Sequence, residues 1–171
     1  QVLEYFVESD LLTNEDGTWT IKDKNVKLSN SINAILTARI DRLSAMVRET
    51  VKAAAVIGRE FEIPVLQEVM RGQETGHVED DYLKDRIRLA EEGQIWTAVN
   101  VLRYIFRHSL LREAVYGMQL GTRLQPLHNL IAVAIEKLYV ANLEDRYVDL
   151  AFHYDRAGIF DNTCYYLRKA A

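Results

Sequence analysis

Apolar residues recur every three or four positions along most of the chain, and this spacing predicts a mainly α-helical protein. Such a stripe is the buried face of an amphipathic helix, with charged residues on the opposite face. The first stripe lies in a short segment, Val2–Ser9. The longer stripes predict helices over 32–43, 44–58, 64–70, 79–92, 109–116, 124–138, 144–156 and 160–171.

Alternating and turn-rich segments interrupt the helices at two places. Asn14–Gly17 has turn composition and is followed by the alternating run Thr18–Ile21, so residues 11–21 are expected to form a hairpin. Two further strands are expected at 95–99 and 102–106, joined near Asn100. Three helices followed by a β-hairpin is the element order of a winged helix.

Two connections complete this arrangement. Residues 59–62 are expected to form a short extended link. Residues 71–77, which contain two glycines, are expected to form a loop.

Cationic residues gather where the strand at 102–106 meets the next helix. Arg103 and Arg107 alternate onto one face of the strand, His108 follows, and Ser109 is placed to cap the helix. Two interpretations stay open. These cations, with Arg112, could pair with the acidic helix at 79–92, or they could meet a phosphate at the free N–H groups of the helix start.

The composition narrows the classes of protein to which the chain could belong. The chain has 171 residues, 49% of them hydrophobic and 27% charged, as in ordinary globular domains. A net charge of −4 argues against general nucleic-acid binding, and no apolar run approaches membrane-helix length. The single cysteine, Cys164, fits a reducing compartment. Because the chain begins at Gln1 without a leader pattern, it is expected to be part of a longer protein.

No self-contained active site is evident. The sequence contains no Gly-x-x-x-x-Gly-Lys-[Ser/Thr] loop, and its histidines lack metal-ligand spacing. Adjacent carboxylates diverge around a helix, so they are interpreted as solvated. These histidines and paired acids are His77, His108, His128, His153, Asp80, Asp81, Glu91 and Glu92. The aromatic residues are interpreted as core.

Five segments, taken together and in order, resemble the region after the ATPase core in bacterial signal-transduction ATPases of the STAND class. They are Ser31–Leu43, Ala54–Phe61, Phe106–Ala114, Leu150–Gly158 and Tyr166–Ala170. In that family the core is often fused to an adenylate/guanylate cyclase, a kinase or a DNA-binding domain, and tetratricopeptide repeats follow it.

The resemblance implies a role for each part. Residues 1–43 would end the ATPase core and its helical lid, 44–140 would form the winged-helix module with its following helices, and 143–171 would begin a tetratricopeptide-like repeat arm. Related ATPases carry a Met-His-Asp motif at this strand-to-helix junction, where the histidine contacts ADP. Here the matching residues are Arg107, His108 and Ser109. His108, with Arg107, is therefore the candidate nucleotide sensor.

The resulting hypothesis is a cytoplasmic, non-catalytic regulatory region of a nucleotide-switched signalling ATPase. It would hold no cofactor itself, while ATP or ADP with magnesium would bind the upstream ATPase core. That core, and a protein or small-molecule effector on the repeat arm, would be its partners. The alternatives are a DNA-binding winged-helix regulator, disfavoured by the acidic helix at 79–92, and a tetratricopeptide-type interaction scaffold.

Overall fold

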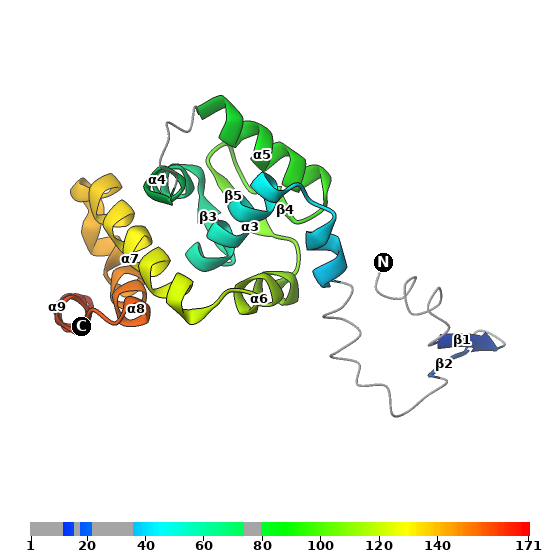
Figure 1. The fold of residues 1–171 in the computed structure, drawn as a ribbon. Coiled ribbons are helices and arrows are strands. Elements are labelled where there is room, and N and C mark those ends of the chain that lie inside the picture. The colour runs from blue at the N-terminus through cyan, green and yellow to red at the C-terminus, as the bar shows by residue number, and fades with distance from the viewer. Residues whose placement is uncertain (1–11, 16–17, 22–35, 74–79) are drawn as a thin grey trace. The chain divides into compact units, whose positions relative to one another are not determined.

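The computed structural model describes residues 12–15, 18–21, 36–73 and 80–171, and the chain divides into two units, Gln1–Ile35 and Leu36–Ala171. In the first unit, strands β1 (Leu12–Glu15) and β2 (Thr18–Ile21) pair antiparallel, which confirms the predicted hairpin. The helix predicted at 2–9 lies outside the described residues. The second unit is mainly helical, as predicted (Figure 1).

The second unit opens with the elements of a winged helix. A helix over 36–41 precedes α3 (Ala45–Ile57), β3 (Glu60–Glu62), α4 (Ile63–Gln73) and α5 (Asp80–Glu92). Strands β4 (Trp96–Ala98) and β5 (Arg103–Phe106) form the predicted β-hairpin. The sheet is antiparallel with the order β3-β5-β4, so β5 is its central strand.

The sheet has one more strand than the sequence pattern predicted. Residues 60–62 pair with β5, placing Glu60 opposite Ile105 and Glu62 opposite Arg103. Only three residues long, β3 is too short to show a period of two. Helix α4 also continues through Gly72 to Gln73, so the loop predicted to begin at 71 was wrong at its start.

The core of this module is an aromatic cluster under the sheet. Phe61, Trp96 and Phe106 are almost fully buried, and their ring centroids lie 5.0–5.9 Å apart. The Trp96 Nε1–H donates to the Ile87 carbonyl at 3.1 Å, which satisfies its polar atom inside the core. Each of the three strands supplies one ring, so the cluster fixes the sheet against the helices.

Four helices and a 3₁₀ segment complete the second unit, on one side of the winged helix in Figure 1. They are α6 (Ser109–Gly117), α7 (Gly121–Leu138), the 3₁₀ segment η1 (Val140–Arg146), α8 (Tyr147–Ala157) and α9 (Phe160–Ala170).

Helices α8 and α9 form the predicted C-terminal pair. Gly158 separates them with φ of 77°, a left-handed conformation that glycine adopts without strain. The rings of Tyr154 and Tyr166 stack across the pair at 5.8 Å. Helix α8 begins at Tyr147 and not at 144 as predicted, because residues 140–146 wind as a 3₁₀ segment with a kink at Asn142.

Replacing Phe61 with Ala should lower the free energy of unfolding by about 3–5 kcal/mol, because it leaves a cavity in the aromatic cluster. Phe160→Ala is the matched control, since Phe160 is 70% exposed and Phe61 only 2%. Urea unfolding followed by circular dichroism measures both. Equal losses for the two variants would contradict this account of the core.

Candidate functional site

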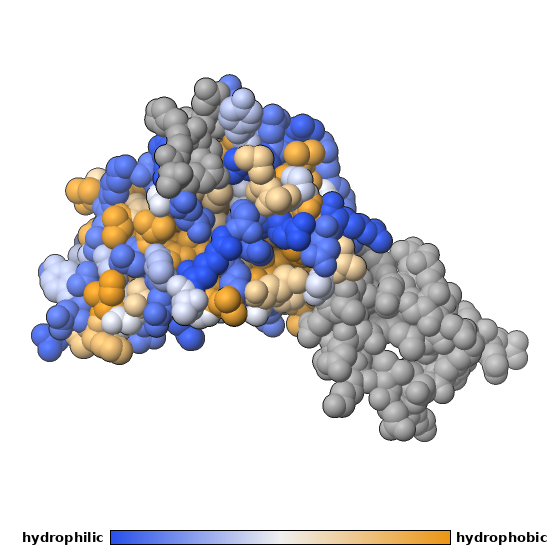
Figure 2. Space-filling view, in the orientation of Figure 1, coloured by the Kyte–Doolittle hydropathy of each residue, from blue (hydrophilic) through white to orange (hydrophobic). Residues whose placement is uncertain are grey.

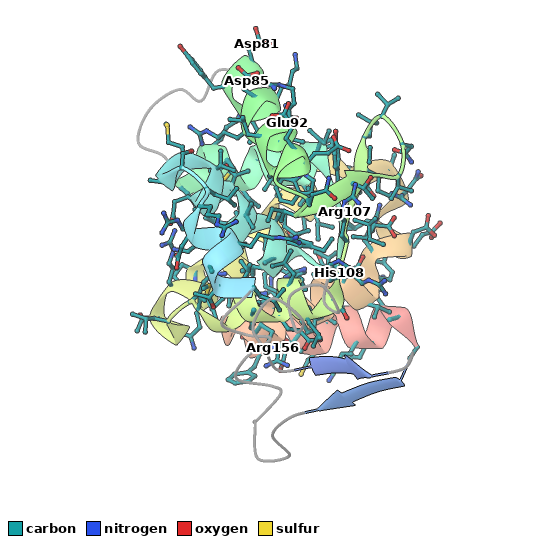
Figure 3. The ribbon with its side chains drawn as sticks, turned by 90° about the vertical axis from the view of Figure 1, so that its right-hand side faces the viewer. Asp81, Asp85, Glu92, Arg107, His108 and Arg156 are labelled. Atoms are coloured by element: carbon teal, nitrogen blue, oxygen red, sulfur yellow. The ribbon has the colours of Figure 1, made fainter. Side chains whose placement is uncertain are left out.

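The junction between β5 and α6 places Arg107 and His108 at the surface. Phe106 anchors the end of β5 in the core, and the Arg107 N–H donates to the Ile95 carbonyl at 3.1 Å. His108 follows in an extended conformation (φ −135°, ψ 130°) as the N-cap residue of α6. Both side chains are exposed and adjacent in the chain (Figure 3).

The capping of α6 differs from the prediction. His108, and not Ser109, occupies the N-cap position, and its side chain makes no capping hydrogen bond. The His108 carbonyl accepts from the N–H groups of Leu111 and Arg112. The prediction that Ser109 caps the helix was wrong because Ser109 is already the first residue of α6, one position after the N-cap. The imidazole is therefore not used in holding the helix start.

Among the described residues Arg103 and Arg112 have partners outside α5, so the interpretation that they pair with the acidic helix was wrong. Arg103 pairs with Glu60 at 3.2 Å and with Glu62 at 3.3 Å, since the strand register sets Glu62 directly opposite. The Arg112 Nε–H donates to the Ala55 carbonyl at 2.8 Å. Arg103 and Arg112 are thus structural, whereas the described residues place no hydrogen-bonding side chain beside Arg107 or His108.

Helix α5 neutralises its own cations. Lys84 pairs with Asp81 at 3.0 Å, and Arg88 pairs with Asp85 at 3.5 Å and Glu92 at 2.6 Å. Figure 3 shows these acids along α5, apart from the labelled Arg107 and His108. A DNA-recognition helix needs cations free to meet phosphates. The helix that would read DNA in a winged helix is poorly suited to it.

The sequence did not predict a cluster of ion pairs and hydrogen bonds around Glu62. This Glu62 cluster consists of Glu62, Arg103, Tyr139 and Arg146. The Glu62 carboxylate accepts hydrogen bonds from Arg146 at 2.6 Å and from the Tyr139 hydroxyl, besides its contact with Arg103. The Arg146 guanidinium lies over the Tyr139 ring, 4.4 Å from its centroid. Because the partners are 41–84 residues apart in the chain, no local spacing could reveal them.

Within the Glu62 cluster the pKa values of Glu62 and Tyr139 are shifted in opposite directions. Burial disfavours the Glu62 carboxylate, but hydrogen bonds from Tyr139 and Arg146 and the charges of Arg146 and Arg103 outweigh it and lower the pKa of Glu62. Burial and the hydrogen bond to Glu62 raise the pKa of Tyr139 to about 12. The cluster therefore ties β3 to η1 in its ionised form.

A cavity of about 370 Å³ lies beside this cluster, between the winged helix and the C-terminal helices. Glu60, Glu62, Arg103, Arg146 and Asp149 supply its charged wall. The rest of its lining is Ile57, Gly58, Phe61, Val65, Ile135, Tyr139, Phe152 and His153. Its cations already have carboxylate partners, so the cavity offers no ready anion site.

The described histidines divide into two environments. His108 is exposed, whereas His128 and His153 contact each other in the interior; His77 lies outside the described residues. Among the described residues no group of three or more histidine, cysteine or acidic side chains could hold a metal ion. Cys164 is exposed on α9. Comparison of the chain with protein families, curated proteins and solved structures gave no match.

Replacing Glu62 with Gln should cost about 1.5–3 kcal/mol of stability at pH 7, the range for hydrogen bonds to a charged group. Because the pKa of Glu62 is lowered on folding, its carboxylate stabilises the fold above the ordinary carboxyl range and less as pH falls. The gap between wild type and variant should therefore shrink below about pH 4.3. Denaturant titrations across this range measure it.

Glu60→Gln is the control on the same strand. Its side chain is 45% exposed against 19% for Glu62, and the exposed Arg103–Glu60 pair is expected to contribute less than about 1 kcal/mol. A Glu62→Gln loss no larger than this, or one independent of pH, would contradict the assigned role of the cluster.

The chain should not be retained on duplex DNA at physiological salt, because Lys84 and Arg88 are paired within α5. The double variant Asp81→Lys with Asp85→Lys removes acids from the same face and should gain weak, salt-dependent binding. Fluorescence anisotropy with a labelled duplex compares the two. Tight binding by the unmodified chain would overturn this conclusion.

Proposed function

We propose that this chain is a non-catalytic regulatory region of a nucleotide-switched signalling ATPase. The observation that carries the proposal is the exposed Arg107–His108 pair at the β5–α6 junction, whose side chains are not hydrogen-bonded within the described residues. The proposal also rests on the resemblance of five ordered segments to the region after the core of STAND ATPases.

The junction has the chemistry to hold an anion presented by a neighbouring domain. The first N–H groups of α6 lack helical acceptors, and an imidazole and a guanidinium stand beside them. Under this proposal His108 and Arg107 contact the phosphate end of ADP in the upstream core. Exchange for ATP, with its magnesium, removes that contact and releases the winged helix.

The release can act as a switch only if the contacts differ between the two nucleotide states. His108 supplies such a contact because its imidazole is not needed by the fold around it. Arg103 and Arg112 are already committed to Glu62 and to the Ala55 carbonyl. They would hold the module together in both states.

Output would pass through the C-terminal helices. Residues 44–140 would form the winged-helix module and 143–171 the start of a repeat arm that contacts a protein or small-molecule effector. The Glu62 cluster ties β3 to η1, which leads into α8, so the two parts would move as one body.

The compartment proposed for this function is the cytoplasm, where ATP and a reduced Cys164 are expected. Within the part of the chain that the structure describes, none of the helices combines the length and apolarity needed to span a bilayer. The face shown in Figure 2 mixes charged and apolar side chains.

In the parent protein, His108→Ala should accelerate ADP release roughly tenfold or more, because a charge-assisted hydrogen bond contributes about 1.5–3 kcal/mol. Stopped-flow displacement of a fluorescent ADP measures the rate. The control is Arg88→Gln, which removes an exposed cation from α5 and should leave the rate unchanged.

Two results would refute the proposal. One is an ADP release rate that His108→Ala does not change. The other is a parent sequence without Gly-x-x-x-x-Gly-Lys-[Ser/Thr] upstream of Gln1, since the nucleotide would then have no phosphate-binding loop.

A further inference from the structure

A pair of buried histidines joins α7 to α8. His128 is fully buried and His153 is 3% exposed, and their Nδ1 atoms lie 2.9 Å apart. Two nitrogens at this distance share one proton, so one ring donates and the other accepts. Because burial lowers the pKa of both rings, both imidazoles are neutral at pH 7.

Two further contacts extend the pair to two more helices. The Tyr116 hydroxyl of α6 lies 3.0 Å from His128 Nε2. His153 hydrogen-bonds the backbone of Ile57, at the end of α3, in a way that favours its protonated form, so the acceptor is the Ile57 carbonyl. The four groups form one continuous chain from α6 through α7 and α8 to α3.

The contact between the two Nδ1 atoms fixes the protons of the neutral pair. One ring carries its proton on Nδ1 and donates it, so the other ring offers a bare Nδ1 and carries its proton on Nε2. The structure thus assigns opposite tautomers to the two histidines.

The surroundings of the pair oppose a positive charge. Burial is the main cause that lowers the pKa of His128 to about 4 and that of His153 to about 3. Arg112 of α6 acts on both rings and Arg156 of α8 acts on His128. The cavity that His153 lines also carries the carboxylates of Glu60, Glu62 and Asp149.

We propose that the Tyr116–His128–His153–Ile57 chain is an acid-opened latch that fastens α7 and α8 to the end of α3. The cavity borders His153, which gives solvent protons a route to a ring that is otherwise buried. The latch does not depend on the proposed nucleotide switch, and its tests contain no nucleotide.

Proton addition weakens the latch in two steps. A first proton on His128 makes both of its nitrogens donors and places a cation beside Arg112 and Arg156. A second proton, on His153, sets two N–H groups against each other across the Nδ1–Nδ1 contact. Since both pKa values are lower in the folded chain than in the unfolded one, the latch contributes fully above about pH 6.5 and is lost as pH falls toward 4.

Two residues already present in the chain allow the separation of the C-terminal helices from the winged helix to be measured. Cys164 is the only cysteine and is exposed on α9, while Trp96 lies in the winged-helix core. In a Trp19→Phe background, energy transfer from Trp96 to an acceptor on Cys164 reports the separation of the arm from the winged helix. Acidification from pH 7 to 4 should lower the transfer while the near-ultraviolet signal of the Trp96 core persists.

His153→Gln is the diagnostic variant, because glutamine keeps a donor and an acceptor but cannot take a proton. It should keep the transfer efficiency of wild type at pH 7 and lose the acid transition. Tyr116→Phe should move the transition, and Tyr165→Phe, which removes a hydroxyl from a 55% exposed ring, should not. Unchanged transfer in wild type, or its loss together with the Trp96 signal, would overturn the latch.

Histidine ¹⁵N spectra of the unmodified chain give a second test that needs no variant. At pH 7 they should show one ring as the Nδ1–H tautomer and the other as the Nε2–H tautomer, with neither ring titrating near pH 6.5. The same tautomer in both rings, or an ordinary titration of either ring, would refute the proposal even where His153→Gln fails to fold.

Discussion

The last turn of α3 is the constraint on which the rest of the second unit depends. A helix leaves its final carbonyls without helical donors, and inside a protein these must be satisfied. The Gly58 N–H donates to the Ala54 carbonyl, and Arg112 of α6 donates to the Ala55 carbonyl. His153 of α8 hydrogen-bonds the backbone of Ile57 at the end of the helix. The carbonyl groups at the end of α3 thus hold α6 and α8 to the winged helix.

The Glu62 cluster adds a second attachment close to the first. Strand β3 begins three residues after α3 ends and presents Glu62 to Tyr139 and Arg146 of the C-terminal part. One attachment uses neutral histidines and weakens in acid, whereas the other uses a carboxylate with a lowered pKa. Together they join the winged helix and the C-terminal helices into one body.

The surfaces of the second unit differ in whether their cations are paired with acids. Helix α5 pairs Lys84 and Arg88 with its own acids, so these two cations are not available to phosphates. Arg107 and His108 instead stand at a helix start with no such pairing among the described residues.

For the described residues, the sequence by itself predicted most of the helices and the two hairpins, because amphipathic periodicity and turn residues act locally. It did not predict β3, the capping by His108, or the partners of Arg103 and Arg112. Only the tertiary structure decided the Glu62 cluster and the His128–His153 pair. Their members are 25 to 84 residues apart, and each becomes a partner only when burial removes water as the competing hydrogen-bond partner.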